Sequence, residues 1–225
     1  MVVLPPRLFP PAPYYHWLAG DDGLRVVVDT AARYDKRCKA AHRYDIIDVR
    51  GALQLTVPLG KPHGMNGRAT WNDAPVSTHD QWWTRHRSAL ESAYGRTPYF
   101  EFIIDRFDGV FRSPERWDQW PSAIDLIREA NAAVCHILAV DAPEYADASV
   151  LCASIGADGQ EGGSSAALTD CRTDRFAISG QPAYWQVRSN VHGFCPGLSI
   201  LDILFNLGPE ASLYLRDMHR SLARE

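Results

Sequence analysis

The residues best suited to acid–base chemistry lie near the C-terminus. His192 precedes an apolar run, 198–207, which contains three polar residues, Ser199, Asp202 and Asn206. Their spacing of i, i+3 and i+7 places them on one side of a helix. We predict that His192 is a general base and that the carboxylate of Asp202 orients and charge-stabilises its imidazole ring. The alternative interpretation is that the polar residues form the solvent-facing stripe of an ordinary amphipathic helix.

His86 is a second candidate for a general acid or base. It follows Trp82 by one turn on the inner face of a helix predicted over residues 80–94, which a capping box of Thr78 and Gln81 is expected to start. A histidine has an ordinary pKa close to neutrality, so it can take or give a proton at physiological pH. The same position is also typical of a histidine that is hydrogen-bonded inside the core.

A strongly basic segment follows the first predicted strand. Residues 33–43 carry five cationic side chains and one acidic side chain, Asp35, in a protein whose formal net charge is −4. Such a cluster can hold phosphate or carboxylate groups, because guanidinium and ammonium groups make charge-assisted hydrogen bonds to both. We predict that Lys36 and Arg43 bind a substrate in this way. A solvated loop that binds nothing is the alternative.

The sequence contains no familiar cofactor motif. A phosphate-binding loop, a Gly-x-Gly-x-x-Gly motif and a Gly-x-Ser-x-Gly motif are all absent from it. A tetrahedral zinc site would need four ligands, and the candidates lack the Cys-x2-Cys pairing that zinc sites use. We therefore predict no metal and leave the cofactor undefined. The candidate zinc ligands are Cys152, Cys171, His192 and Cys195.

The composition limits the class of protein. The 225 residues are 46% hydrophobic, which is enough for one sizeable core. The net negative charge argues against nucleic-acid binding, and no apolar run approaches the roughly 20 residues that cross a bilayer. Pro5 and Pro6 interrupt the apolar N-terminus, so we expect no signal peptide. The five cysteines lack close pairing, which favours reduced thiols and a cytoplasmic location. The composition leaves the oligomeric state open.

Strand and helix patterns alternate along the chain. They predict a single α/β or α+β domain over residues 1–225, with N-terminal strands and a hairpin followed by central and C-terminal helices. The proline-rich residues 1–13 should form an extended arm, and the Gly/Ser-rich residues 156–167 a flexible loop. Strands are expected over 24–29, 42–49, 53–57, 149–155 and 183–187. Helices are expected over 14–19, 80–94, 122–140 and 198–207, and from 97 and 209 onward.

A set of short motifs is spread over most of the chain. The most specific is the C-terminal segment from His192-Gly193-Phe194 to Gly208. The others are Phe9-Pro10-Pro11, Tyr14-Tyr15, Asp29, Tyr34-Asp35-Lys36, Arg43, Leu55-Thr56-Val57-Pro58, Trp82, His86, Tyr94, Tyr99-Phe100-Glu101, Asn131 and Gln186. Together these motifs resemble the WbqC-like protein family of bacteria. Two departures stand out: His42 replaces the family's asparagine, and the region 141–182 is reworked.

The resemblance implies a bacterial cytoplasmic protein, some of whose relatives are associated with gene sets for O-antigen and other surface polysaccharides. The resemblance brings no mechanism, but the residues would suit an enzyme that transfers an acyl or aminoacyl group to an amino sugar on a nucleotide. In this hypothesis Lys36 and Arg43 hold the diphosphate. His192 with Asp202, or else His86, takes the proton of the attacking amine. The remaining substrate-binding residues, some of which stack on the sugar or nucleobase, are Tyr14, Tyr15, Trp185, Ser199 and Asn206.

Two other functions fit the same residues. One is a non-catalytic protein that binds a ligand or a partner in the same pathway, and the other is a metal-dependent hydrolase that uses His86, His192 and Asp202. A catalytic role predicts that His192 and Asp202 converge in one cleft, together with Lys36 or Arg43. A scaffold role predicts that Asp202 is exposed alone or caps backbone groups.

Overall fold

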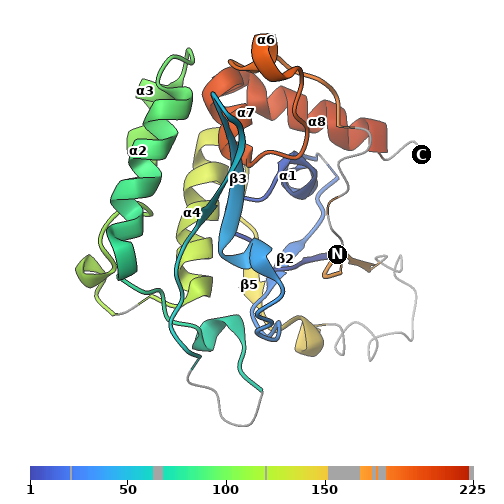
Figure 1. Cartoon of the computed structure of the whole chain (residues 1–225). Coiled ribbons are helices and arrows are strands. Elements are labelled where there is room, and N and C mark those ends of the chain that lie inside the picture. Colours follow the sequence, from blue (N-terminus) through green and yellow to red (C-terminus); the bar gives the residue numbers. More distant parts are fainter. Residues whose placement is uncertain are drawn as a thin grey trace.

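A parallel β-sheet lies beside the N-terminus, and the longer helices lie to its left and above it in the view of Figure 1. The structure is a computed structural model that describes residues 1–20, 22–62, 68–119, 121–151, 168–173, 176 and 181–222. Within these residues the sheet has four strands in the order β5-β2-β1-β6, and all neighbouring pairs are parallel. The predicted mixed α/β class is therefore confirmed. The strands are β1 (Val2–Leu4), β2 (Val26–Asp29), β5 (Glu144–Ala146) and β6 (Thr169–Asp170).

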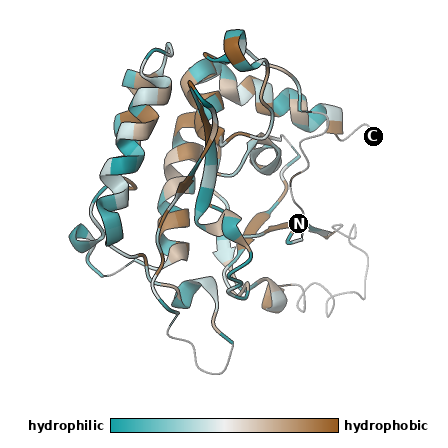
Figure 2. Cartoon of the chain, in the orientation of Figure 1, coloured by the Kyte–Doolittle hydropathy of each residue, from teal (hydrophilic) through white to brown (hydrophobic). Residues whose placement is uncertain are grey.

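The sheet is buried on both faces, which explains why its inner strands are apolar apart from Asp29 at the end of β2. Successive side chains of a strand point to opposite faces. Val2 and Leu4 belong to the main core, whereas Val3 and Val27 pack with Ala148 in a second, smaller cluster. In Figure 2 the short strands beside the N-terminus are among the most hydrophobic segments of the chain.

Three element predictions are corrected by the structure. Residues 1–13 do not form a simple arm, because Val2–Leu4 is an inner strand of the sheet. Pro5 and Pro6 only limit the length of that strand. Residues 149–151, the described part of the predicted strand 149–155, are helical, and residues 183–187 have no strand. The predicted loop 156–167 lies outside the described residues.

The predicted hairpin is confirmed and has two chemically distinct faces. Strands β3 (Arg43–Asp48) and β4 (Gly51–Thr56) pair antiparallel, with Asp45 opposite Gln54. Tyr44 and Ile46 point into the core. Arg43, Asp45 and Gln54 therefore share the opposite face. The short 3-10 turn η1 (Lys39–Ala41) leads into this hairpin.

The helices follow the predicted periodicity, although one of them starts differently. Ser122 and Asp125 form a reciprocal capping box at the start of α4. The capping box predicted from Thr78 and Gln81 is wrong, because Asp80 and Gln81 have positive φ angles of 62° and 46° and break the helix before Trp82. The helices are α1 (Ala12–Ala19), α2 (Trp82–Tyr94), α3 (Phe100–Ile103), α4 (Ala123–Leu138), α6 (Ser189–His192), α7 (Ile200–Leu207) and α8 (Ala211–Leu222). Further 3-10 turns are η2 (Trp71–Asp73), η3 (His79–Gln81), η4 (Ile104–Phe107), η5 (Pro114–Arg116) and η6 (Gly208–Glu210).

The helices pack mainly by their apolar sides. Helix α1 lies against α8. Helices α2 and α7 both contact strand β3, and α3 contacts α7. In the described part of the chain, no helix is both long and apolar enough to cross a lipid bilayer.

Candidate functional site

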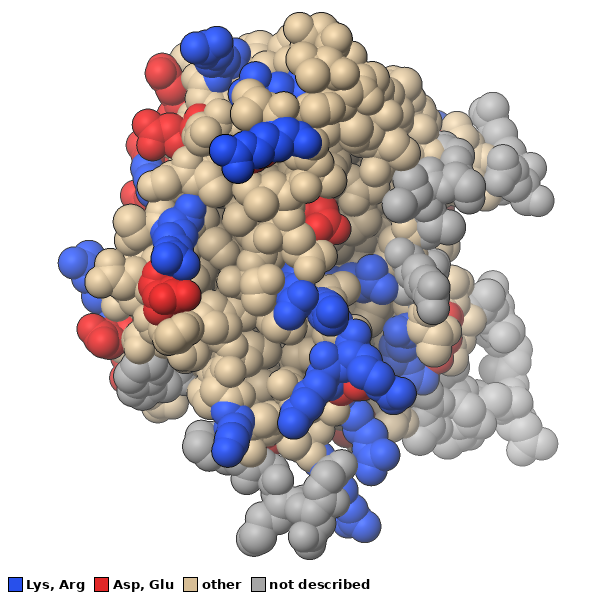
Figure 3. Space-filling view, viewed as in Figure 1, with Lys and Arg blue, Asp and Glu red and all other residues tan. Residues whose placement is uncertain are grey.

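A cationic cavity lies beyond the carboxyl ends of the parallel strands. It has a volume of about 230 Å³ and is lined by three cationic side chains, Arg7, Lys39 and Arg43. Arg7 follows β1, and Lys39 lies in the loop that follows β2. Ligands of open α/β sheets commonly bind at this end of the strands. Figure 3 shows Lys and Arg side chains gathered on the face that carries β3 and the turn before it.

Three backbone hydrogen bonds hold the walls of the cavity together. The Leu8 amide donates to the Ala40 carbonyl at 3.2 Å, and the Ile200 amide donates to the Pro10 carbonyl at 3.0 Å. The Ser199 amide donates to the Asp45 carbonyl at 2.8 Å. The cavity is therefore formed by segments that are far apart in the sequence, and it depends on the tertiary fold.

The polar side chains of the hairpin form a chain along the cavity wall. Arg43 Nη1 donates to Gln54 Oε1 at 3.2 Å, and Gln54 Nε2 donates to Asp45 Oδ1 at 3.0 Å. Arg43 Nε is buried and has no hydrogen-bond partner among the described residues. The Arg7 guanidinium stacks 4.6 Å from the centre of the Phe176 ring. Among the described residues, the only side-chain hydrogen-bond partner of Arg43 is the neutral Gln54, so its positive charge is available to an anion in the cavity.

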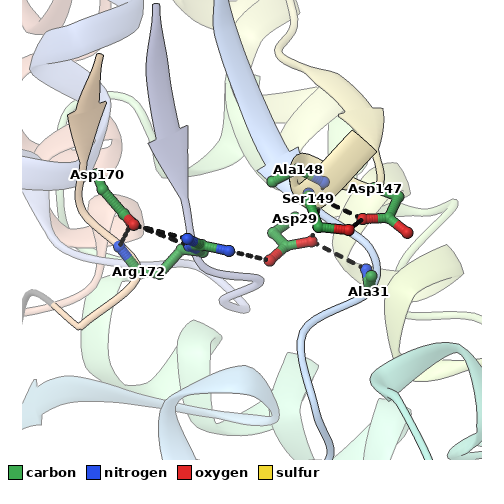
Figure 4. Close-up of polar contacts among 7 residues, drawn as sticks. All are labelled: Asp29, Ala31, Asp147, Ala148, Ser149, Asp170 and Arg172. Atoms are coloured by element: carbon green, nitrogen blue, oxygen red, sulfur yellow. Dashed lines mark hydrogen bonds and ion pairs between the residues drawn. The ribbon is translucent and has the colours of Figure 1, made fainter. Parts of the chain in front are cut away.

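A second polar network fixes the ends of the strands at the same edge of the sheet (Figure 4). Asp29 Oδ1 accepts from the amides of Ala31 and Ala148 at 3.0 and 3.3 Å. Asp29 Oδ2 accepts from Arg172 Nη1 at 3.3 Å, and Arg172 also pairs with Asp170 at 2.7 Å. The hydrogen bond from the Arg172 side chain lowers the pKa of Asp170. Arg172 thus links β6 to β2 across β1, and both oxygens of Asp29 are already engaged.

The structure does not pair His192 with Asp202. His192 Nε2 donates to the carbonyl of Asp48 at 3.2 Å, at the tip of the hairpin. Asp202 is fully buried on α7, and its Oδ2 accepts from Tyr184 Oη at 2.5 Å and from Gln186 Nε2 at 3.0 Å. Neither His192 nor Asp202 lines the cationic cavity. The convergence that the catalytic hypothesis requires is therefore missing.

Asp202 instead anchors the segment that precedes α7. Burial raises the pKa of Asp202, while hydrogen bonds from Tyr184, Tyr94 and Gln186 favour its ionised form. Gln186 in turn donates to the Cys195 carbonyl at 2.9 Å and accepts from the Cys195 amide at 2.8 Å. The polar stripe of α7 is thus an internal scaffold. It is not a solvent-facing surface, because Asp202 and its partners are enclosed.

Asn206 and Ser199, the other members of the stripe, have different surroundings. Asn206 Oδ1 accepts from the Val187 amide at 2.9 Å, and its Nδ2 donates to the Asp202 carbonyl at 2.7 Å. Ser199 caps α7, because its hydroxyl accepts from the Leu201 amide at 3.2 Å. Ser199 also lines the cationic cavity. Of the three, only Ser199 is placed where it can meet a ligand in that cavity.

His86 is a buried histidine with both ring nitrogens engaged. Its Nε2 donates to the Thr56 carbonyl at 3.2 Å, so its Nδ1 accepts from the Tyr44 hydroxyl at 3.0 Å. Burial lowers the pKa of His86 to about 4. The side chain is therefore neutral near pH 7, as expected of a hydrogen-bonded core histidine.

The aromatic residues predicted to stack on a ligand are mostly inaccessible. Tyr14 and Tyr15 are fully buried, and their hydroxyls donate to the Pro5 carbonyl at 3.0 Å and to Asn131 Oδ1 at 2.6 Å. Their rings have no open face for a sugar, so we leave them out of the site. Trp185 is 55% exposed but does not line the cavity.

The structure separates the predicted cationic residues. Lys36 is exposed on the loop and does not line the cavity, whereas Arg43 does. His42, which departs from the family pattern, keeps a hydrogen-bonding role because its Nδ1 donates to the Val57 carbonyl at 2.8 Å. Burial lowers the pKa of this histidine.

No metal site is found in the described part of the chain. There, no three His, Cys, Asp or Glu side chains come together closely enough to hold an ion. His86, His192 and Asp202, which the hydrolase hypothesis needs, have separate partners. Cys152, one of the candidate zinc ligands, lies outside the described residues.

Sequence reasoning missed three of the polar residues that line the cavity, namely Arg7, Asp45 and Gln54. Arg7 was hidden because the strand before it was not predicted. Asp45 and Gln54 lie on two predicted strands, and their alternation with apolar residues already places them on one face of a hairpin. That alternation was the available signal.

Comparison with known proteins identifies the family to which the chain is similar. The chain matches the model of the WbqC-like protein family over residues 6–161. This range includes the charged residues of the cavity, Arg7, Lys39, Arg43 and Asp45. It ends before residues 192–208, where the motif resemblance was most specific. Neither curated proteins nor solved structures gave a match.

Proposed function

The chain belongs to the WbqC-like protein family, and we propose that it transfers an acyl or aminoacyl group to an amino sugar carried on a nucleotide. The observation that carries this proposal is the convergence of Arg7, Lys39 and Arg43 on one cavity. Three cationic side chains and one acid give the cavity a positive charge. A diphosphate is the part of a nucleotide-linked sugar that such a cavity would recognise.

The size of the cavity limits how the ligand would lie. Its volume of about 230 Å³ is below the ~300–1,000 Å³ of typical small-molecule sites. It can therefore enclose only part of a nucleotide-linked sugar. We assign the phosphates and the adjoining sugar ring to the cavity, and the nucleoside then extends outward over the basic loop that contains Lys36 and Arg37.

Asp45 is the candidate base for the transfer. It is the only carboxylate among the described residues that line the cavity, and Gln54 holds it beside Arg43. In the proposed reaction the sugar amine attacks the acyl carbonyl, a C–N bond forms, and the leaving group of the donor departs. Asp45 accepts the proton that the amine loses. Asp45 thus takes the role of general base that the sequence analysis assigned to His192 supported by Asp202.

A non-catalytic binding protein of the same pathway is the second candidate. It is favoured by the scaffold role of Asp202, whose hydrogen bonds fix the segment before α7 and do not reach the cavity. This candidate uses the same cationic cavity and predicts the same ligand. It differs only in predicting that no acyl group is transferred.

Two variants separate binding from chemistry. Arg43→Gln should weaken the binding of a uridine-diphosphate amino sugar by about ten- to a hundredfold in calorimetry, because one charge-assisted contact is lost. Arg85→Gln, at an exposed position outside the cavity, is the matched control and should bind normally. Asp45→Asn should retain binding but lose acyl transfer. Undiminished ligand binding by Arg43→Gln would refute the cavity as the phosphate site.

A further inference from the structure

A second cavity lies at the opposite end of the sheet. Its volume is about 380 Å³, and its walls include Val26 at the start of β2 and Glu144 at the start of β5. Strand β2 has four residues and so spans roughly 13 Å. The cationic cavity lies beyond the other end of this strand. A ligand here would therefore be separate from one bound among Arg7, Lys39 and Arg43.

Two charged side chains of this cavity pair with each other, and two others have no partner among the described residues. Arg25 and Glu144 form a two-pronged ion pair, with Nε–Oε1 and Nη2–Oε2 distances of 2.9 and 2.7 Å. Arg216 also lines the cavity, and its buried Nε has no hydrogen-bond partner among the described residues. Asp141 lines it as well, and its carboxylate has no hydrogen bond or ion pair within the described part of the chain. Among the described residues, one cation and one anion of this cavity are thus left without a partner.

The remaining walls are largely apolar. They include the half-buried indole of Trp17 and the side chains of Leu24, Val26 and Val140. Leu24 is 38% exposed, so a ligand that covered it would remove apolar surface from water. The volume falls within the range typical of small-molecule sites. Within the part of the chain that the structure describes, the cavity therefore combines one unpaired positive group, one unpaired negative group and apolar side chains.

We propose that this cavity binds a free amino acid with an apolar side chain. Its carboxylate would pair with the Arg216 guanidinium, which presents several donors to a carboxylate. Its ammonium group would pair with Asp141, and its side chain would cover Trp17 and Leu24. A simple anion would leave Asp141 unused, and a simple cation would leave the guanidinium unpaired. A zwitterion offers a partner to both groups at once.

Calorimetry on the full chain tests this proposal. Leucine and phenylalanine should bind, whereas N-acetylleucine and 3-methylbutylamine, which each lack one charge of leucine, should bind at least tenfold more weakly. Arg216→Gln and Asp141→Asn should each weaken leucine binding at least tenfold. Asp141 is exposed, so its variant should fold normally. Arg43→Gln, in the other cavity, should bind leucine like the unmodified protein.

Three results would overturn the proposal. They are the absence of leucine and phenylalanine binding up to about 10 mM, unchanged leucine affinity in both cavity variants, and equal affinity for leucine and N-acetylleucine. None of these results bears on the binding of a nucleotide-linked sugar, because that ligand is assigned to the cavity at the other end of the sheet.

Discussion

Replacing Asp202 by alanine should strongly destabilise the protein without a direct effect on the cationic cavity. The substitution leaves the buried Tyr184 hydroxyl without its acceptor, whereas Gln186 Nε2 keeps the Cys195 carbonyl and Tyr184 Oη as acceptors. A buried donor left without a partner costs about 1–3 kcal/mol. We therefore expect the free energy of unfolding to fall by about 2 kcal/mol, which is a sizeable part of the ~5–15 kcal/mol of a typical domain.

The matched variant is Asp202→Asn, which keeps the size of the side chain. Its carbonyl oxygen can still accept from Tyr184 and Gln186. Burial already opposes the charge of Asp202 and raises its pKa, so removing that charge should cost only about 1 kcal/mol. Urea unfolding, followed by tryptophan fluorescence and extrapolated linearly, measures both differences.

Two results would refute the scaffold interpretation. One is an Asp202→Ala protein that unfolds at the same urea concentration as the unmodified protein. The other is an Asp202→Asn protein that is as stable as the unmodified one, binds the nucleotide-linked sugar normally and yet transfers no acyl group. The second result would show that Asp202 takes part in the transfer reaction, and it would argue against Asp45 as the base.

Three further predictions concern stability. Because the pKa of His86 is about 4 in the folded protein and about 6.5 when unfolded, the unfolded state binds more protons between these values. His86 alone should therefore make the protein about 2 kcal/mol less stable at pH 5 than at pH 8. His86→Gln should reduce this difference in urea midpoints, and an unchanged pH dependence would contradict the assignment. Ser122→Ala should cost about 1 kcal/mol by removing the cap of α4, and a thermal midpoint equal to that of the unmodified protein would contradict it. Gly208→Ala should cost about 2 kcal/mol, because its φ is +53° and the added Cβ would lie 2.5 Å from the Tyr99 ring. Normal thermal stability of that variant would show that the ring moves freely.

Local sequence patterns were sufficient where neighbouring residues determine the structure. The hairpin was predictable because two alternating strands flank a tight turn at Gly51, whose φ is +117°. Helix α4 was predictable from Ser122 and from the apolar spacing of its inner face. Strand β1 was not, because a segment of three residues before two prolines carries little local signal. Its position depends on pairing with β2 and β6.

The candidate site was harder to predict from the sequence than the strands and helices, because it depends even more on tertiary contacts. Arg43 was identified from its charge, but its partners Gln54 and Asp45 lie together only because the hairpin pairs them. His192 and Asp202 are close in sequence, yet α6 places the histidine at the hairpin tip and α7 buries the carboxylate. Sequence analysis could show that a buried carboxylate needs partners. It could not show that Tyr184 and Gln186 supply them.

We propose that the phosphates bind in the cationic cavity and not along the basic loop as a whole. Two variants with the same loss of charge test it in calorimetry with a uridine-diphosphate amino sugar. The first double variant, Lys39→Gln with Arg43→Gln, removes two positive charges from residues that line the cavity. The second, Lys36→Gln with Arg37→Gln, removes two positive charges from exposed residues of the basic loop that do not line the cavity. We predict that the first pair weakens binding at least a hundredfold and the second less than tenfold. Equal losses in the two pairs would show that the cavity residues have no special role in binding the phosphates.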